Sequence, residues 1–175
     1  DDAKVEAALD NIHLDFKVNV NKKKSEIVMN NEVVEEEIRT MEVADNVSKV
    51  SAIKKVRERM VALQQRMGNH KGVVLDGRDI GTVVFPNAEL KLFLTARPDV
   101  RTLRRYDELK AKGVEVSMEE IRKNLEQRDH DDITRAESPL RQAEDAIVID
   151  NSDLTLDEQL QKAIGYANDT VINTI

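Results

Sequence analysis

Val-Val-Leu-Asp-Gly-Arg-Asp-Ile-Gly-Thr-Val-Val-Phe-Pro-Asn-Ala, residues 73–88, is the stretch that decides the fold. It opens with three apolar residues that do not alternate with polar ones, which predicts a buried strand of a parallel sheet over 73–75. This strand would end at Asp76, and the charged segment 77–79 would follow it at the carboxyl edge of the sheet. Ligands bind at that edge in open α/β sheets, so the stretch predicts a ligand site.

A tight turn with a surface ion pair is the plainer interpretation of the same residues. It explains Gly77 and the Arg78–Asp79 dipeptide, but it does not explain three charges crowded at the end of a buried strand. A ligand site is therefore favoured. An apolar strand ending in Asp is also the pattern that holds Mg²⁺ in P-loop phosphotransferases, which makes Asp76 a candidate metal contact, directly or through water.

The composition limits what the chain can be. A length of 175 residues suits one domain with at most a small subdomain, and 3% aromatic residues predict a mainly aliphatic core. The net charge of −7 argues against general nucleic-acid binding, which needs a basic surface. The absence of cysteine excludes disulfides, thiolate zinc sites and cysteine nucleophiles. No signal peptide or membrane-length apolar run is present.

The chain before residue 70 predicts a helix, a small antiparallel sheet and a further helical stretch. Residues 3–11 have a helical apolar face, and strict alternation over 14–20 predicts a half-buried strand. Further strands at 26–30 and 33–34 complete a meander, whose lysine run at 22–24 is best explained as a solvated hairpin tip. Helical sequence begins at Thr40 and ends at Gly68–Asn69.

The remainder alternates strands and helices. Apolar strands are predicted over 90–94 and 146–149, with a helix from Pro98 towards Gly113 between them. Two capping boxes, Ser117–Glu120 and Thr155–Glu158, open two further helices. With the strand at 73–75, this order predicts right-handed βαβ crossovers and a parallel sheet.

Two segments carry a resemblance to a known family. The first is Asp-Gly-Arg-Asp-x-Gly-Thr-Val-Val-Phe-Pro over 76–86, and the second is Arg-Asp-His-Asp-Asp-Ile-Thr-Arg over 128–135, followed by Ser-Pro-Leu at 138–140. The chain resembles bacterial cytidylate kinases from about residue 2 to 167. The resemblance implies transfer of the γ-phosphoryl group of ATP to CMP or dCMP, with Mg²⁺, on the P-loop nucleoside monophosphate kinase fold. That fold is α/β, a parallel sheet flanked by helices with a small antiparallel β insertion.

The resemblance also implies four regions. They are the monophosphate-binding insertion at 1–39, acceptor-binding helices and core strands at 40–96, the lid and arginine-rich helices at 97–141, and the last core strand and C-terminal helix at 142–175.

The phosphate-binding loop of such kinases, Gly-x-x-x-x-Gly-Lys-Ser/Thr, does not occur in the 175 residues. The nearest spacing runs from Gly72 to Asp79, but Arg-Asp replaces Lys-Ser/Thr, strand formers separate the glycines, and the sequence that follows is not helix-like. We therefore expect the N-terminal P-loop strand and helix to be absent from this chain, which begins Asp-Asp without methionine, and the chain alone to be inactive.

The second segment has charges at i, i+3, i+4 and i+7, one face of a helix. Two surface salt bridges worth about 0.5 kcal/mol each are the ordinary explanation. The resemblance instead implies that Arg78 and Arg128 contact the CMP phosphate, that Asp132 takes the ribose hydroxyls, and that Arg135 supports both. Arginine forks suit phosphate oxygens, and we expect Arg78, Arg128 and Arg135 to share one cavity.

The other site residues are also implied by the resemblance. Asp79 and Ser48 would accept from the cytosine amino group, and Arg57 would donate to the ring carbonyl and nitrogen. Four arginines lie on one face of the helix after Pro98, namely Arg97, Arg101, Arg104 and Arg105. A solvated face is the commoner case, but Arg104 and Arg105 match lid arginines that stabilise the transferred group.

Two alternatives remain open. One is a kinase for another monophosphate, such as UMP or AMP, and the other is a non-catalytic nucleotide- or partner-binding module. We expect a cytoplasmic monomer that binds neither nucleic acid nor membranes.

Overall fold

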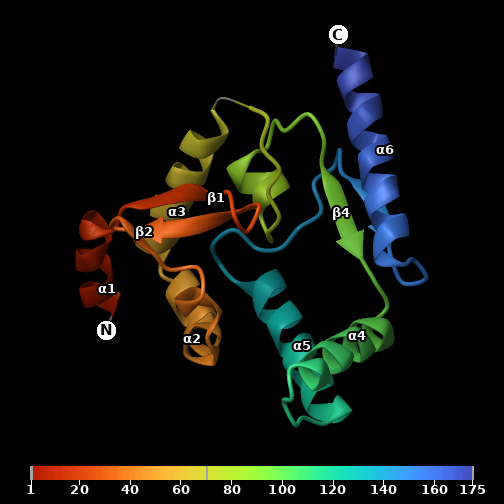
Figure 1. Ribbon diagram of the computed structural model, residues 1–175, viewed down its shortest axis with the longest axis horizontal. Coiled ribbons are helices and arrows are strands. Elements are labelled where there is room, and N and C mark those ends of the chain that lie inside the picture. The colour runs from red at the N-terminus through yellow and green to blue at the C-terminus, as the bar shows by residue number, and fades with distance from the viewer. Residues whose placement is uncertain (1, 70, 175) are drawn as a thin grey trace. The chain divides into compact units, whose positions relative to one another are not determined.

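The computed structural model describes residues 2–69 and 71–174, except for the side chains at 41, 44, 45, 48, 173 and 174. It forms two compact units, residues 1–71 and 72–175, which are called here the first and the second unit (Figure 1). Each is described by itself. The boundary between the units falls inside the predicted 40–96 region, and the four-region division remains a prediction.

The first unit contains the predicted meander. Helix α1 (Asp2–Ala8) and the 3-10 turn η1 (Leu9–Asn11) precede strands β1 (Leu14–Asn19), β2 (Lys24–Met29) and β3 (Glu32–Val33). The strands pair antiparallel in the order β1-β2-β3. Asn30 and Asn31 both have positive φ, 49° and 70°, as a tight hairpin turn between right-twisted strands requires. The antiparallel insertion is therefore confirmed.

The expected half-burial of the first strand is wrong. Phe16 is 55% exposed and Val18 is 68% exposed. A small sheet buries its apolar face only where a second layer covers it, and these two side chains lie outside such a layer. The buried side chains of the meander are instead two carboxylates, Glu26 and Glu35, at 5% and 4% exposure.

Both buried carboxylates are fully engaged. Glu26 accepts from Asn19 Nδ2 at 2.9 Å and from Lys22 Nζ at 2.8 Å. Glu35 accepts from the backbone amide of Ile27 at 3.1 Å and from the guanidinium group of Arg39. A buried carboxylate is tolerated only when it is paired in this way. The contacts of Glu26 lie within the meander, and those of Glu35 join the meander to the segment that follows it.

The helices of the first unit follow the sequence pattern. The 3-10 turn η2 (Glu37–Arg39) leads into α2 (Met41–Ser51), and α3 (Lys54–Gly68) ends where predicted. Val56 on α3 is buried. Within the described ranges, every helix is too short or too polar to cross a membrane.

The second unit contains a two-stranded parallel sheet. Strand β4 (Leu92–Thr95) pairs with β5 (Ile147–Asp150), with Leu92 opposite Ile147 and Thr95 opposite Asp150. These two strands and the α/β class are confirmed. The strand predicted over 73–75 is wrong: the segment has no strand pairing, and Val74 is fully exposed. Apolar side chains favour a strand, but only a ladder of hydrogen bonds to a neighbour makes one.

The segment after Asp79 also differs from expectation. It was expected not to be helix-like, but Ile80–Val84 form the π-helical turn η3, closed by a 2.7 Å bond from Phe85 N to Ile80 O. The carbonyl of Asp79 accepts from the backbone amide of Val83 at 2.9 Å, and Val84 is 2% exposed. Burying Val84 explains why the chain coils here rather than extending.

The helices of the second unit begin at the predicted signals. They are α4 (Pro98–Ala111), α5 (Met118–Thr134) and α6 (Leu156–Thr174). Both capping boxes form, with Glu120 N donating to Ser117 Oγ and Glu158 N donating to Thr155 Oγ1, each at 3.2 Å. Gly113, with φ of 73°, follows α4. On α6 the apolar side chains of Leu156 and Leu160 are exposed, at 83% and 55%.

Lys91 fastens the start of β4. Its side chain is 8% exposed, and Nζ donates to the carbonyl of Pro86 at 2.5 Å and to both carboxylate oxygens of Asp145 at 2.8 Å. The stem of Lys91 passes over Gly81, where a Cβ would stand 3.2 Å from Lys91 Cδ. One ammonium group thus joins the turn before β4 to the segment before β5.

We expect Lys91→Ala to lower the free energy of unfolding by about 2 kcal/mol, because a largely buried charged donor and its packed stem are lost. Urea unfolding measures the change. Lys112→Ala is the matched control, since that exposed lysine, directly after α4, pairs with Glu108 at the surface, and it should cost less than about 0.5 kcal/mol. Equal effects of the two substitutions would contradict the assignment.

Acid should weaken the meander through Glu35. The hydrogen bond from Arg39, followed by that from the Ile27 amide, holds the pKa of Glu35 below its ordinary value of 4.5. A lowered folded-state pKa stabilises the fold above the unfolded-state pKa, and this stabilisation is lost as the pH falls through the folded-state value. The melting temperature should therefore fall below about pH 4.5, and Glu35→Gln should be less stable at pH 7 with a smaller acid-induced drop. Glu32→Gln, at an exposed position, should keep the wild-type pH profile.

Candidate functional site

Two arginines distant in sequence meet at one carboxylate in the second unit. Arg78 Nε lies 3.0 Å from Asp132 Oδ2, and Arg135 Nη1 lies 3.4 Å from Asp132 Oδ1. The side chains of Asp132 and Arg135 are 16% and 18% exposed, and that of Arg78 is 40% exposed. Arg78 belongs to the segment 76–86, and Asp132 and Arg135 belong to the segment 128–135. Their meeting is the part of the predicted site that the structure brings together.

The end of α5 explains how Arg135 reaches Asp132. The helix stops at Thr134, and Arg135 is extended, with φ of −58° and ψ of 143°, so it does not continue the predicted helical face. The chain then turns back: Ser138 has φ of 50°, its carbonyl accepts from Arg135 Nε at 2.7 Å, and Leu140 N donates to the backbone carbonyl of Asp132 at 2.7 Å. The Ser-Pro-Leu segment thus orients the guanidinium group.

The ordinary explanation of this segment, a pair of surface salt bridges along the helix, is met only in part, because Asp132 pairs with Arg135 three residues on but both side chains are largely buried. Asp131 Oδ1 accepts from Gln127 Nε2 at 2.7 Å rather than from Arg135. Arg128 is exposed and makes no ion pair with another residue that the structure describes. Arg78 and Arg135 therefore meet as expected, while the shared cavity and the place of Arg128 in it remain predictions.

A second arginine–carboxylate pair lies one turn earlier on α5, and sequence reasoning missed it as a pair. Arg101 on α4 forms a two-pronged contact with Asp129, at 2.5 and 3.0 Å. The hydrogen bond from Arg101 holds the pKa of Asp129 below its ordinary value, and the charges of Arg78 and Arg128 act in the same direction. Asp129 thus lies within electrostatic range of three guanidinium groups. Its partner is 28 residues away, so helical spacing carried no signal for the contact.

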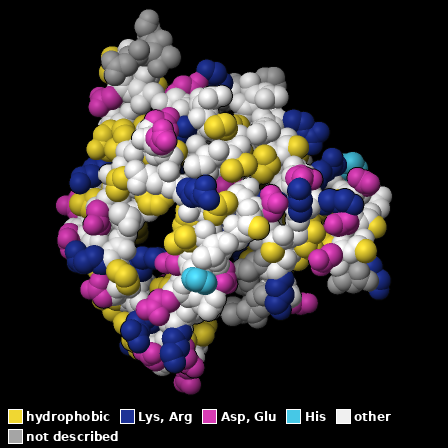
Figure 2. Space-filling view, turned by 180° about the vertical axis from the view of Figure 1, so that it is seen from behind, with side chains coloured by type: hydrophobic (Ala, Val, Ile, Leu, Met, Phe, Trp, Pro, Cys, Tyr) yellow, Lys and Arg dark blue, Asp and Glu magenta, His cyan; other side chains and the backbone are white. Residues whose placement is uncertain are grey.

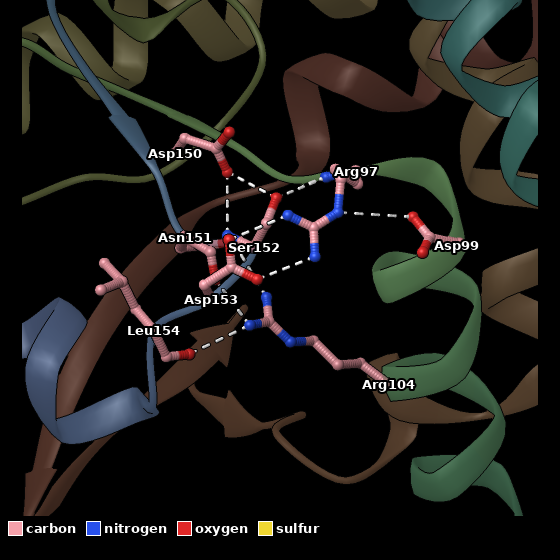
Figure 3. A network of polar contacts seen from close by, with 8 residues as sticks. All are labelled: Arg97, Asp99, Arg104, Asp150, Asn151, Ser152, Asp153 and Leu154. Carbon is pink, nitrogen blue, oxygen red and sulfur yellow. Dashed lines mark hydrogen bonds and ion pairs between the residues drawn. The ribbon is translucent and has the colours of Figure 1, made fainter.

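The other arginines of α4 do not form a merely solvated face. Arg104 donates to Asn151 Oδ1 at 2.9 Å and to the carbonyls of Asn151 and Leu154 at 2.7 and 3.1 Å. Arg97 forms a two-pronged contact with Asp153, at 2.9 and 2.8 Å. Figure 3 shows both guanidinium groups directed at the loop between β5 and α6.

Hydrogen bonds of a buried serine also hold the same loop. Ser152, 8% exposed, accepts from the backbone amide of Arg97 at 2.8 Å through Oγ, and its own amide donates to Asp150 Oδ1 at 2.9 Å (Figure 3). Both strands end here, so this network closes the carboxyl edge of the parallel sheet. Arg105, by contrast, contacts Glu108 of its own helix at 2.6 Å and is exposed.

Charges of both signs are interspersed over the face of the molecule seen in Figure 2. The view shows Lys and Arg side chains next to Asp and Glu side chains rather than a continuous basic surface. This agrees with the pairing of Arg78, Arg97 and Arg101 to carboxylates. Positive charge is therefore concentrated locally, around individual carboxylates.

The residues predicted to contact the base are split between the units. Asp79 is 8% exposed in the second unit. Arg57, in the first unit, donates from Nε to the carbonyl of Ser51 at 3.3 Å, which ties α3 to the end of α2. The side chain of Ser48 lies outside the described residues. Their joint role in base recognition remains a prediction.

Asp76 does not build a metal site by itself. It is exposed, and among residues 2–69 and 71–174 no group of three or more histidine or carboxylate side chains converges to hold an ion. Mg²⁺ in kinases is held by one or two carboxylates together with substrate phosphates, and Asp76 is a single carboxylate.

We expect Arg104→Ala to loosen the β5–α6 loop and to lower the free energy of unfolding by about 1 kcal/mol, because three hydrogen bonds from an exposed charged donor are lost. Amide hydrogen exchange over 151–155 should accelerate. Arg105→Ala is the matched control, since its only described contact lies within its own helix, and it should leave exchange in the loop unchanged. Unchanged exchange in both variants would show that Arg104 does not hold the loop.

Comparison with known proteins identifies the family of the chain. The family model described as Cytidylate kinase matches residues 2–169. The cytidylate kinase of Parabacteroides distasonis is 55% identical over 155 residues, which cover 89% of this chain and 68% of that protein. That of Bacteroides fragilis is 55% identical over 148 residues, 85% of this chain and 65% of that protein. That of Flavobacterium johnsoniae is 51% identical over 164 residues, 94% of this chain and 71% of that protein. The chain spans about two thirds of the length of these relatives, and it belongs to the cytidylate kinase family.

Proposed function

We propose that the protein to which this chain belongs transfers the γ-phosphoryl group of ATP to CMP or dCMP. The observation that carries the proposal is the meeting of Arg78 and Arg135 at Asp132 in a member of this family. Two guanidinium groups held side by side suit the phosphate of a nucleoside monophosphate, which is a dianion near neutral pH.

The acceptor phosphate is held by Arg78 and Arg128 in this proposal, with Arg135 supporting them and Asp132 accepting from the ribose hydroxyls. Phosphoryl transfer depends on positioning and charge neutralisation, so no side chain needs to act as a strong base. The arginines hold the acceptor in place and offset the negative charge that would otherwise repel the donor.

Base recognition is assigned to Asp79, Ser48 and Arg57. The cytosine amino group is a donor and needs acceptors, which Asp79 and Ser48 supply. Uracil carries a carbonyl at that position, so a buried carboxylate there disfavours UMP. The burial of Asp79 supports this role, because a desolvated carboxylate discriminates more strongly than an exposed one.

Of the two lid candidates, Arg105 is better placed to contact the transferred group. Its described partner is the exposed Glu108, and a surface ion pair of this kind costs little to break. Arg104 would have to release three acceptors of the β5–α6 loop first. We propose that Mg²⁺ accompanies ATP, with Asp76 as its candidate contact, and that the protein is a cytoplasmic monomer.

The 175-residue polypeptide should bind CMP about tenfold more tightly than UMP or AMP, since one charge-assisted contact to the base is worth that much. Asp79→Ala should remove most of this preference. Isothermal titration calorimetry with the three nucleotides measures both. Equal affinity for all three, or no binding of CMP, would contradict the proposal.

The same polypeptide should form no CDP from ATP and CMP, because its sequence contains no Gly-x-x-x-x-Gly-Lys-Ser/Thr loop to hold the triphosphate. A coupled assay for ADP together with chromatography for CDP tests this. Detectable ATP-dependent CDP would show that the triphosphate is held by other means.

A further inference from the structure

We propose that Asp132 is a positioning residue for the phosphate site, beyond any contact with ribose. It holds Arg78 and Arg135, which come from different segments, so that both guanidinium groups can act on one phosphate. The inference rests on the proposed function, because it assumes that Arg78, supported by Arg135, binds the phosphate of the acceptor.

Arg78 approaches Asp132 through the nitrogen at the base of its guanidinium group. Its described contact with Asp132 is made by Nε, at 3.0 Å. A guanidinium group offers five N–H donors in a rigid fork. In this proposal the contact, an ion pair without an aligned hydrogen bond to Asp132 Oδ2, holds the group by charge and leaves its two terminal nitrogens to the ligand. Those terminal nitrogens are the edge that binds phosphate oxygens bidentately.

The carboxylate group of Asp132 is largely buried. Asp132 Oδ2 is shielded from solvent and has no well-aligned hydrogen bond, so its charge is balanced by the nearby Arg78. Burying an anion is favourable only when a cation compensates it. Asp132 is thus built to keep Arg78 in place, and the alignment of Arg78 depends on the negative charge of Asp132.

Asp132 also balances the charges of the two arginines. Arg78 and Arg135 would repel each other if they approached without an anion between them. With Asp132 the group carries one net positive charge, so it remains attractive to a phosphate dianion. Arg135 is held in addition by its contact with the Ser138 carbonyl, 2.7 Å from Nε, which leaves Arg78 as the member that depends most on Asp132.

A positioning role and a ribose-only role predict different results with inorganic phosphate, which has no ribose. If Asp132 positions the arginines, Asp132→Asn weakens binding of both CMP and inorganic phosphate. If it contacts only ribose, the same substitution weakens CMP alone. Removal of a negative charge without any positioning effect would strengthen phosphate binding.

The experiment titrates the 175-residue polypeptide with inorganic phosphate, followed by ³¹P NMR, and with CMP, followed by calorimetry. We expect Asp132→Asn to weaken both by about tenfold, the scale of one charge-assisted contact. Asp131→Asn is the matched control: it removes the same charge one residue away, from an exposed side chain that pairs with Gln127. It should change neither affinity by more than about twofold.

Arg78→Lys tests the same idea without altering the carboxylate, which protects the test if Asp132→Asn does not fold. Lysine keeps the charge, but its single nitrogen cannot pair with Asp132 and also bind two phosphate oxygens as a guanidinium fork can. Phosphate binding should weaken about tenfold in Arg78→Lys. Adding Asp132→Asn to it should cost less than about twofold more, because the two residues act as a unit.

Three results would overturn the proposal: a loss confined to CMP, a gain in phosphate affinity, or fully additive effects of the two substitutions. If the wild-type polypeptide binds CMP and phosphate normally but one of these results is obtained, the proposed function stands and only the positioning role fails. If the wild type binds neither probe, the proposed function fails and the positioning role fails with it.

Discussion

Pairing of guanidinium groups with carboxylates from other parts of the chain is the interaction on which the second unit depends. Arg78 is held by Asp132, Arg101 by Asp129 and Arg97 by Asp153. The first two pairs connect segments that share no backbone ladder, and the third joins the segments that follow the paired strands β4 and β5. An acidic chain with a net charge of −7 can in this way assemble a small region of positive charge without a basic surface.

The arginines of α4 divide by what they contact. Arg104 and Arg97 hold the loop that follows β5, where the two parallel strands end, and Arg101 joins α4 to α5. Only Arg105 remains engaged solely within its own helix. A single helical face therefore combines structural anchors with one side chain whose contact is easily released. Their shared spacing gave no indication of this division, because spacing records the direction of a side chain and not its partner.

The first unit also depends on carboxylates paired with basic side chains, but there the carboxylates are buried. Its meander leaves Phe16 and Val18 exposed and buries Glu26 and Glu35. The carboxylates are stable there because lysine, arginine, amide and backbone donors surround them. A buried charge with all of its acceptors occupied fixes one geometry more sharply than an aliphatic contact does, since hydrogen bonds are directional. The small sheet is thus connected to η2 by a specific polar contact.

Local features of this chain were determined by the sequence: the capping boxes at Ser117 and Thr155, the start of α4 at Pro98, and the left-handed Gly113 all form as predicted. They depend on residues within one turn of each other, so a few neighbouring letters suffice. The strand predicted over 73–75 failed because a strand requires a neighbour to pair with. The Arg101–Asp129 and Arg78–Asp132 pairs were decided by tertiary structure alone. Each is a contact between charges, and attraction between charges depends on distance in space, which sequence separation does not record.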